Sequence, residues 1–454
     1  MGGSSKKYLQ TLLEITSKND EGFYLVGGSV RDHLLGKDGS DFDFTGQNVA
    51  KIARRFASEN KSPCVPLDDT PGRETFRVII EKRFNFDFTD MQGNSIEEDL
   101  AQRDFTINAM AIRLDDFLED KKTFIDLKQG QSDLKNGIVR VMPGNIFSAD
   151  PCRMLRAFRF AGTLNFEIEA ETLHKIESQK SSLEKTAPER IYNEWLLFLG
   201  SQPVYSLLRL MDQTGLLECV LPETKELQET ALDTVKHLEG LIPNPETILA
   251  HNSPLKIFTG KKTALLKFAG LLYQLMPSPS GDFSIAGGKL DEPSKIVQLL
   301  KKLRASNADI QFIYRTILCR VMAADSNLSF AGEKIDESKM YQFVKNNESE
   351  LIPGIFLACA VESALAKERG TTTDEFFQAA YRVSEFYFQR YLPAMDENTL
   401  LNGDDLIRHF KLSPSPLFQV ILEQIEEARV LGTIKSKNEA EAVAKKIIQT
   451  QQVQ

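Results

Sequence analysis

The sequence contains few cysteines and no cysteine motif. Its 454 residues include only five, and no two of them form a Cys-x-x-Cys pair: Cys64, Cys152, Cys219, Cys319 and Cys359. Such a chain is expected in a reducing compartment, with neither a disulfide framework nor a zinc site. The expected location is therefore the cytoplasm.

Long apolar runs are also missing. No stretch of eighteen apolar residues occurs, and the first residues, MGGSSKKYLQ, contain no apolar signal-peptide core. These absences predict a protein without membrane spans and without secretion. Low-complexity tracts and fixed-period repeats are not evident either, so a repeat architecture is not expected.

The chain has no excess of positive charge. It carries 55 Lys and Arg against 64 Asp and Glu, a net charge of -9, so its overall charge does not indicate nucleic-acid binding. An RNA or DNA partner would need a local basic patch. Residues 140–160 contain one acid, Asp150, and four arginines that suit phosphate groups: Arg140, Arg153, Arg156 and Arg159.

The pattern of apolar residues changes about a third of the way along the chain. Before about Val141, the segments GFYLVGG, SDFDFTG, FRVII, RFNFDFTD, AMAIRL and FIDL predict strands. After it, apolar residues recur at helical spacing almost to the end. The sequence therefore predicts an α+β protein, with a sheet-containing N-terminal domain followed by an all-helical remainder.

One N-terminal stretch, FYLVGGSVRDHLLGKDGSDFDF, combines paired glycines with paired aspartates. Gly27 and Gly28 end a predicted strand before a predicted helix, where backbone N–H groups can approach a phosphate. Asp41 and Asp43 share one face of a strand, about 7 Å apart, and can hold Mg²⁺ for phosphoryl transfer. Glycines at an ordinary turn and a solvated edge strand are the alternatives, but the combination favours a catalytic site.

A third carboxylate is expected on a neighbouring strand. In FNFDFTD the phenylalanines share one face, so Asn85, Asp87 and Thr89 share the other. Asp87 is therefore the candidate, with ordinary strand alternation as the alternative. Asp90 falls on the phenylalanine face or past the end of the strand and is less favoured.

The motifs of this N-terminal stretch resemble those of a known family. LVGGSVRDHLLG and SDFDF resemble the first signature of class II tRNA nucleotidyltransferases and the related bacterial poly(A) polymerases, which share a DNA-polymerase-β-like catalytic head. Four further signatures follow in the same order at residues 97–112, 126–134, 149–172 and 188–195. The C-terminal residues resemble the tail of long bacterial members.

The resemblance implies four parts. They are a nucleotidyltransferase head with a mixed sheet (1–140), a nucleobase-reading neck (141–200), a helical body (201–395) and an RNA-binding tail (396–454). Four tail lysines, Lys435, Lys437, Lys445 and Lys446, are consistent with an RNA-facing patch or with a solvated helix face.

The resemblance also implies how the head binds a nucleotide. The two glycines and Arg31 would cradle the triphosphate, Arg103 and Asp104 would contact the ribose and triphosphate, and Asn108 would help to position the nucleotide. The family usually has two arginines in this segment, but here Gln102 precedes Arg103.

The neck segment ADPCRMLRAFRF carries the residues that would read the base. Asp150 and Arg153 are expected on one face at a helix start, where Asp150 could equally be a capping residue. A carboxylate accepts from an exocyclic amine and a guanidinium donates to a ring acceptor. Such a pair accepts cytosine and adenine and rejects uracil and guanine. Arg156 and Arg159 would add nucleotide-binding charge, and Ala149 stands where the family normally has glutamate.

The body resembles an HD phosphohydrolase domain that has lost its ligands. Tyr273 and Gln274 stand where His-Asp would be expected, and His237 alone cannot build a transition-metal site. The region is therefore interpreted as a degenerate HD-like domain without hydrolase activity. The Pro-, Ser- and Gly-containing stretch 276–294 is expected to be a break between helices.

The length of one connection bears on which nucleotide is added. Only MQGNSI (91–96) separates the third catalytic strand from EEDL, and a short connection of this kind resembles that of CC-adding members. The predicted activity is addition of CC to tRNA from CTP with Mg²⁺, which would require a separate A-adding enzyme in the same cell. Full CCA addition or A addition with ATP, then poly(A) synthesis, are the alternatives. A catalytically idle RNA-binding protein is the alternative from another class.

Overall fold

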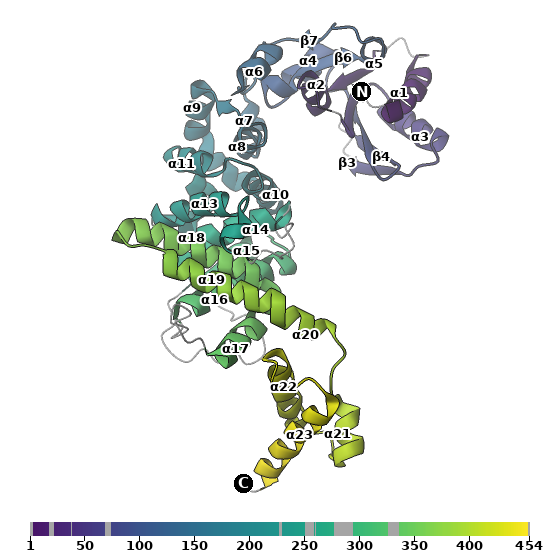
Figure 1. Cartoon of the computed structure of the whole chain (residues 1–454). Helices are drawn as coiled ribbons and strands as arrows, with labels where there is room; N and C mark the ends of the chain where they lie inside the picture. The colour runs from purple at the N-terminus through teal and green to yellow at the C-terminus, as the bar shows by residue number, and fades with distance from the viewer. Residues whose placement is uncertain are drawn as a thin grey trace. The chain divides into compact units, whose positions relative to one another are not determined.

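The computed structural model describes residues 3–17, 22–37, 39–68, 74–226, 229–249, 258, 260–276, 294–325 and 336–452. The chain forms two units (Figure 1): Met1–Pro203 with Arg209–Pro222, and Val204–Leu208 with Glu223–Gln454. The four-part division predicted from the sequence is finer than this and stays a prediction.

A seven-stranded mixed sheet forms the centre of the first unit. The strands are β1 (Tyr24–Val26), β2 (Asp41–Gly46), β3 (Cys64–Asp68), β4 (Thr75–Ile80), β5 (Phe84–Asp90), β6 (Met110–Arg113) and β7 (Ile125–Asp126). Their order is β3-β4-β5-β2-β1-β6-β7, with β2 and β5 parallel and the other neighbours antiparallel. The predicted α+β head with a mixed sheet is therefore confirmed.

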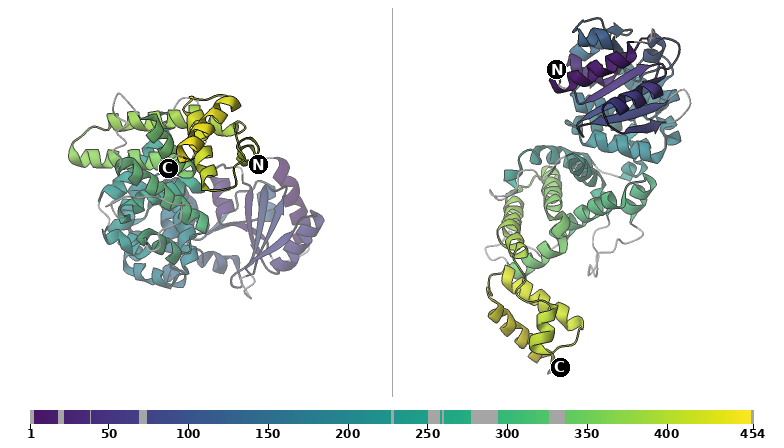
Figure 2. Two further views of the ribbon diagram at one scale, coloured as in Figure 1. Left: turned by 90° about the horizontal axis from the view of Figure 1, so that it is seen from below. Right: turned by 90° about the vertical axis from the view of Figure 1, so that its right-hand side faces the viewer.

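Helices α1 (Gly3–Thr16) and α3 (Val49–Glu59) lie over one face of this sheet (Figure 2, right). The phenylalanines of β2 and β5 point to that face, and Phe56 of α3 packs edge-on against Phe86, with ring centroids 5.0 Å apart. Because side chains alternate along a strand, Asp41, Asp43 and Asp87 point to the opposite face, as the sequence predicted.

The rest of the first unit consists of short helices around the sheet and a helical neck. Its further elements are α2 (Gly28–Leu34), α4 (Ile96–Ala101), η1 (Thr106–Asn108), α5 (Leu114–Leu118), α6 (Gly130–Asn136), α7 (Ile146–Ala149), α8 (Arg153–Leu164), α9 (Ala170–Gln179), η2 (Lys180–Lys185), α10 (Pro188–Leu199) and α12 (Leu216–Val220). Helix α8 packs against α10, where Trp195 is fully buried.

A second, two-stranded sheet lies in the neck and was not predicted. Strands β8 (Ile138–Val139) and β9 (Glu167–Ile168) pair in parallel. Each has two residues, too few for an alternating pattern to be detected in the sequence. Strand β9 is the exception to the prediction that the chain is all-helical after about Val141.

The second unit is helical throughout its described residues. Its elements are α13 (Glu229–Leu241), η4 (Pro245–Thr247), α14 (Lys261–Leu272), η5 (Tyr273–Leu275), α15 (Lys295–Lys302), α16 (Asn307–Asp325), α17 (Glu337–Asn347), η6 (Glu348–Glu350), α18 (Leu351–Arg369), α19 (Asp374–Phe386), the π-helical turn η7 (Tyr387–Tyr391), α20 (Leu392–Asp396), α21 (Gly403–Phe410), α22 (Pro416–Val430) and α23 (Lys437–Gln452). Helix α11 (Tyr205–Gln213) and η3 (Pro222–Glu226) contribute residues to both units.

Helix α18 forms the core of the second unit. The stretch Glu337–Arg369 is long and apolar enough for a membrane span by length and composition, but 72% of its apolar window is buried inside the structure. Helix α18 packs against α13 and α16, so protein, not lipid, covers its apolar surface.

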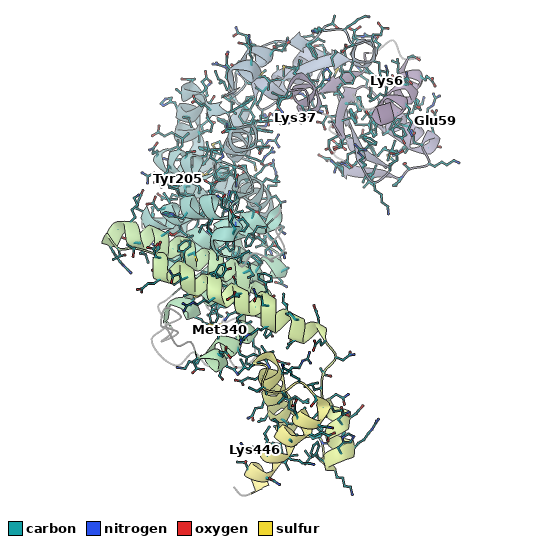
Figure 3. All side chains as sticks on the ribbon, viewed as in Figure 1. Lys6, Lys37, Glu59, Tyr205, Met340 and Lys446 are labelled. Carbon is teal, nitrogen blue, oxygen red and sulfur yellow. The ribbon has the colours of Figure 1, made fainter. Side chains whose placement is uncertain are left out.

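The region predicted to be HD-like contains no metal-ligand cluster within its described residues. The Nε2 atom of Gln274 donates to Oγ1 of Thr230 at 2.6 Å, and Lys267 is fully buried with its Nζ 3.1 Å from Oε1 of Glu239. Apart from Met276 and Ser294, the break predicted at 276–294 lies outside the described residues. In the tail, Lys446 lies on α23 (Figure 3), and Lys437 pairs with Asp405 at 2.7 Å.

Candidate active site

The paired glycines form the turn between β1 and α2, as predicted. Gly27 has φ of 64°, a backbone conformation that favours glycine, and a Cβ at this position would lie 2.9 Å from Nη1 of Arg103. Gly27 therefore permits both the turn and the close approach of Arg103. Gly28 begins α2 immediately afterwards.

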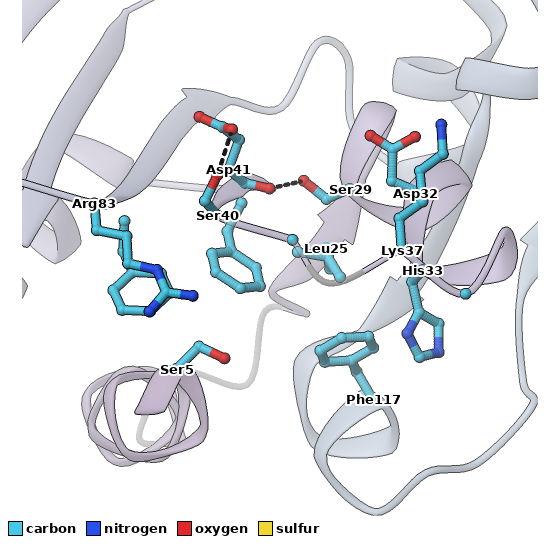
Figure 4. A pocket seen from close by; sticks show the side chains of 14 residues that line it. Ser5, Leu25, Ser29, Asp32, His33, Lys37, Ser40, Asp41, Arg83 and Phe117 are labelled. Carbon is cyan, nitrogen blue, oxygen red and sulfur yellow. Dashed lines mark hydrogen bonds between the residues drawn. The ribbon is translucent and has the colours of Figure 1, made fainter. Parts of the chain in front are cut away.

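Ser29 fixes the main chain that carries the two aspartates. Its Oγ accepts from the backbone N–H of Asp43 at 2.6 Å and lies 3.1 Å from the carbonyl oxygen of Asp41 (Figure 4). The side chain of Asp41 accepts from Nδ2 of Asn85 at 2.6 Å and from Oγ of Ser40 at 3.0 Å. The two carboxylates thus emerge from a strand that α2 holds in place.

The surroundings of Asp43 disfavour its negative charge. Burial raises the pKa of this carboxyl group above its ordinary value, and the neighbouring carboxylates of Asp87 and Asp41 raise it further. The Arg103 guanidinium acts in the opposite direction. Asp99, which is 4% exposed, holds Arg103 through two hydrogen bonds of 3.0 and 2.9 Å.

Asp87 lies beside Asp43 but is engaged by an arginine. The register of β2 and β5 places Asp87 opposite Asp43. Both carboxylate oxygens of Asp87 accept from Arg77 of β4, at 2.7 and 2.6 Å. Arg77 was not singled out from the sequence. Asp90 instead accepts from the backbone N–H of Val49 at the start of α3, at 3.2 Å.

These carboxylates fit a divalent cation. Mg²⁺ prefers oxygen ligands and takes few carboxylates, keeping waters and substrate phosphates as its other ligands. A cation beside Asp43 would offset the repulsion that raises the pKa of that carboxyl group. The described residues contain no group of three or more His, Cys, Asp or Glu side chains placed to hold a metal ion, so two carboxylates would have to be completed by waters and substrate phosphates.

A cavity of about 480 Å³ extends from Asp43 between the head and the neck. Three aspartates line it, Asp43, Asp104 and Asp150, together with six arginines: Arg31, Arg103, Arg153, Arg156, Arg159 and Arg190. Gly27, Gly28 and Asn108 also belong to the lining, whereas Asp41 and Asp87 do not. The cavity thus collects every nucleotide-binding residue predicted from the sequence, with an excess of positive charge that suits a triphosphate.

A chain of hydrogen bonds connects the head side of this cavity to the neck. Nη1 of Arg31 donates to Oδ1 of Asn108 at 2.8 Å, and Nδ2 of Asn108 donates to Asp104 at 3.1 Å. Asp104 then accepts from Nε and Nη2 of Arg156 at 2.8 and 2.7 Å. Although burial alone would raise the pKa of Asp104, Arg156 and Asn108 hold it below its ordinary value. Asp104 thus orients Arg156.

Two residues that sequence reasoning missed organise the arginines of α8. Glu194 of α10 accepts from Nε of Arg159 at 2.7 Å and lies 3.5 Å from Nη1 of Arg156. The Phe160 ring has the guanidiniums of Arg31, Arg156 and Arg159 within 5.4, 5.3 and 4.1 Å of its centroid, and such contacts are attractive. In the sequence, only the repeated arginine beside phenylalanine in RAFRF indicated this arrangement.

The predicted base-reading pair is held by other groups. Asp150 lies just before α8 and accepts from the Cys152 N–H at 3.2 Å and from Nη2 of Arg190 at 2.8 Å. The nearest Arg153 nitrogen is 3.9 Å from Asp150, and Nη1 of Arg153 donates to the carbonyl oxygen of Gln102 at 3.0 Å. Gln102, the departure from the family pattern, therefore contributes through its main chain.

The short connection after β5 is tied to α4. The N–H of Gln92 donates to Asp99 at 2.9 Å, the N–H of Asn94 donates to Glu98 at 2.8 Å, and Ser95 caps α4 by accepting from the Glu98 N–H. Asp99 is the residue that also holds Arg103. The Asp99 carboxylate therefore holds both the connection and Arg103 of the cavity.

A second cavity of about 240 Å³ adjoins Asp41 (Figure 4). Its lining combines the apolar Phe117 with charged or titratable groups from α2 and the β4–β5 turn, including His33, Lys37 and Arg83. Burial lowers the pKa of His33. Ser29 and Asp41 line this second cavity, but none of the six arginines that line the first cavity do.

Three family models match consecutive parts of the chain. The Poly A polymerase head domain matches residues 23–140, the RNA and SrmB-binding site of polymerase A matches residues 165–228, and tRNA nucleotidyltransferase domain 2 matches residues 289–447. With the mixed-sheet head and the arginine-lined cavity, these matches define the protein as an enzyme, a nucleotidyltransferase.

Curated relatives with three different names are similar over nearly the whole chain. An A-adding tRNA nucleotidyltransferase of Deinococcus radiodurans is 27% identical over 93% of this chain and 94% of the relative. A CCA-adding enzyme of Ligilactobacillus salivarius is 28% identical over 96% of this chain and 94% of the relative. A CC-adding tRNA nucleotidyltransferase of Synechocystis sp. is 28% identical over 93% of this chain and 93% of the relative.

The fold agrees with a solved structure of the same kind. The Thermotoga maritima CCA-adding enzyme complexed with tRNA superposes with a TM-score of 0.66 at 22% identity, covering 99% of this chain and 96% of that one. The solved structure shows the fold, and the three family models together with the full-length relatives show that the chain belongs to the family of class II tRNA nucleotidyltransferases and bacterial poly(A) polymerases, as the resemblance of its motifs indicated.

Replacing Arg190 by glutamine should loosen base selection. Arg190 holds the Asp150 carboxylate in an ion pair in which the Arg190 side chain is 55% exposed, and exposed pairs contribute about 0.2–1 kcal/mol. We expect the ratio of kcat/KM for CTP over UTP to fall about two- to fivefold. Arg113→Gln, in an exposed ion pair with Asp115, is the matched control. An unchanged ratio in Arg190→Gln would mean that Asp150 does not read the base.

Proposed function

We propose that this protein adds two cytidines to the 3′ end of tRNA from CTP, releasing pyrophosphate. Membership of the family makes it a template-independent nucleotidyltransferase. The names of the relatives do not decide which nucleotide is added, because A-adding, CCA-adding and CC-adding proteins are 27–28% identical to this chain.

The short connection between β5 and α4 is the observation that favours CC addition. Only residues 91–95 lie between the two elements, and three hydrogen bonds fix them to α4. So few residues cannot reach far, and a movement would also disturb Asp99 and with it Arg103. Among the described residues, the connection after β5 therefore gives the cavity no long segment with which to change its shape for a second kind of base.

The residues of the cavity divide into two groups in the proposed reaction. Arg31 and Arg103 would bind the triphosphate at the β1–α2 turn. At the neck, Asp150 would accept from the exocyclic amine of cytosine while Arg153 donates to the adjacent ring nitrogen. The 3′-hydroxyl of the RNA attacks the α-phosphate in line, the new ester bond forms, and the bond to pyrophosphate breaks.

Asp41 and Asp43 would hold the divalent cation of the reaction, proposed to be Mg²⁺. When bound there, it would offset the charge of the phosphates and favour the ionised form of the attacking hydroxyl. Ser29 keeps the main chain of both aspartates in place. Asp87 would assist once Arg77 releases its carboxylate.

The other members of the family are the alternatives. Full CCA addition or A addition with ATP would require the cavity to accept adenine, and a poly(A) polymerase would have to repeat ATP addition. An idle RNA-binding protein is disfavoured by the partly buried Asp43 at a cavity with six arginines, because binding of RNA alone does not require a carboxylate there. A CC-adding enzyme would need a separate A-adding partner, and we propose the cytoplasm as their common location.

Product lengths test this proposal. Three tRNA transcripts that end before CCA, after the first C and after CC are incubated with the full chain, Mg²⁺ and CTP, ATP or both. We expect CTP to add two residues to the first transcript and one to the second, and neither nucleotide to extend the third. Addition of a single A to the third transcript would show CCA or A addition instead, and a long ladder with ATP would show poly(A) synthesis.

A further inference from the structure

The face of the sheet that carries Asp43 continues over three more strands. The strand register places Asp87 opposite Asp43, Arg77 opposite Asp87, and Val65 opposite Arg77. Neighbouring strands lie about 4.8 Å apart, so this row extends about 14 Å from Asp43 to the edge strand β3. The row is charged at the centre of the sheet and apolar at its edge.

The outer part of this face is apolar and exposed. Val65 is 41% exposed, and Ile79, which lies two residues beyond Arg77 on β4 and therefore on the same face, is 36% exposed. Leu67, which is 50% exposed, lies at the irregularity of β3 between Pro66 and Asp68 and adds to the apolar edge. Helices α1 and α3 cover the opposite face. Exposed apolar side chains that continue directly from a catalytic face are typical of a surface that binds a partner.

The direction of the reaction indicates what lies on this surface. The nucleotide cavity is lined by the β1–α2 turn, residues 103–108, the neck and residues of β1, β2 and β5, and by no residue of β3 or β4. In an in-line displacement the attacking oxygen stands opposite the leaving pyrophosphate. With the triphosphate on the β1 side of Asp43, the RNA hydroxyl has to approach over β5, β4 and β3.

Arg77 is the charged residue on that path. Its guanidinium makes two short hydrogen bonds to Asp87, yet 37% of its side chain is exposed to solvent. The planar guanidinium can bind a carboxylate or a phosphate with the same pair of hydrogen bonds. An RNA phosphate arriving along the row therefore competes directly with Asp87 for Arg77.

We propose that the Arg77 surface, defined as Val65, Leu67, Arg77 and Ile79, holds the 3′-terminal nucleotides of the RNA, and that Arg77 exchanges Asp87 for a phosphate of that strand. This inference rests on the proposed function and assigns the acceptor side of the same site. The apolar residues contact the single-stranded bases and riboses, whose faces are apolar. The exchange leaves the Asp87 carboxylate available to a cation beside Asp43 only when RNA is present.

The replacement Arg77→Gln tests the contact with phosphate. A transcript lacking CCA is titrated with the full chain in EDTA at several salt concentrations. We expect the slope of log K against log salt to fall by about 0.7, the value of one phosphate contact with a single strand. Arg77→Lys should keep the slope. Arg55→Gln, an exposed arginine on α3 over the opposite face of the sheet, is the matched control and should not change it.

Two further measurements separate this role from a merely structural one. In cytidine addition, Arg77→Gln should raise KM for the transcript about tenfold and leave KM for CTP unchanged. Without RNA, Mn²⁺ binding followed by electron paramagnetic resonance should be several-fold tighter in Arg77→Gln than in the wild type, because Asp87 has lost its competitor.

An unchanged salt slope in Arg77→Gln would overturn the inference, and so would an equal rise in KM for CTP and transcript. Unchanged Mn²⁺ binding would overturn the exchange with Asp87. Cytidine addition by the wild-type protein tests the proposed function separately. The RNA and Mn²⁺ titrations do not depend on turnover, so they decide on Arg77 even if the wild type adds no cytidine.

Discussion

Replacing Asp43 by asparagine should abolish nucleotide addition and, without metal, make the protein more stable. The loss of activity follows from the loss of a charged cation ligand, for which we expect at least about 10³-fold in kcat/KM, or about 4 kcal/mol. Single-turnover addition of cytidine to a transcript lacking CCA measures it.

The gain in stability follows from the raised pKa of Asp43. The folded protein binds the proton of this carboxyl group more tightly than the unfolded chain does. Its contribution to stability is therefore most favourable below the ordinary pKa of aspartate, and it is lost as the pH rises through the raised pKa. At pH 7.5 in EDTA the ionised group destabilises the fold, and asparagine removes that effect.

Thermal unfolding in EDTA and in Mg²⁺ checks this expectation. In EDTA, Asp43→Asn should have a higher melting temperature than the wild type. Addition of Mg²⁺ should raise the melting temperature of the wild type only. Asp115→Asn, an exposed carboxylate on α5, should change neither activity nor the response to Mg²⁺. A lower melting temperature of Asp43→Asn in EDTA would contradict the account of the crowded carboxylates.

Replacing Asp104 by alanine should cause the largest loss of stability. Asp104 is 6% exposed and receives two hydrogen bonds from Arg156. Breaking a buried ion pair by removing one partner costs about 3–5 kcal/mol. A loss of about 3 kcal/mol should lower the midpoint of thermal unfolding of the first unit by about 6–12 °C.

A double-mutant cycle and a pH series control this prediction. Asp104→Ala with Arg156→Met should cost less than the two single changes together, since neither charge is then left without its partner.

Because the pKa of Asp104 is lowered, the contribution of Asp104 to stability is full at neutral pH. It is lost as the pH falls below the ordinary pKa of aspartate. Asp115→Ala breaks an exposed pair and should cost about 1 kcal/mol or less. Equal costs at the two positions would contradict the role of Asp104.

Local patterns in the sequence predicted the head of the protein well. Alternation in SDFDF and FNFDF places phenylalanines on one face and aspartates on the other, and β2 and β5 have this arrangement because two helices cover only the phenylalanine face. The paired glycines predict the β1–α2 turn, which Gly27 makes with a positive φ. These features depend on neighbours in the sequence.

The partners of the site residues could not be predicted in the same way. Arg77 reaches Asp87 from the neighbouring strand, Arg190 reaches Asp150 from another helix, and Glu194 lies between Arg156 and Arg159. Such pairs depend on strand register and helix packing, which the spacing of charges along one chain does not determine. The sequence therefore predicted many of the residues that line the cavity, although not Arg190 or Phe160, and it did not predict which of them hold the others.

A single incubation tests the central claim most directly. A tRNA transcript lacking CCA is mixed with the full chain, Mg²⁺ and equal concentrations of CTP and ATP, and the mass of the product is determined. The account predicts a product longer by two cytidylates, with no adenylate even after long incubation. A product that ends in adenosine, or a ladder of adenylates, would contradict it.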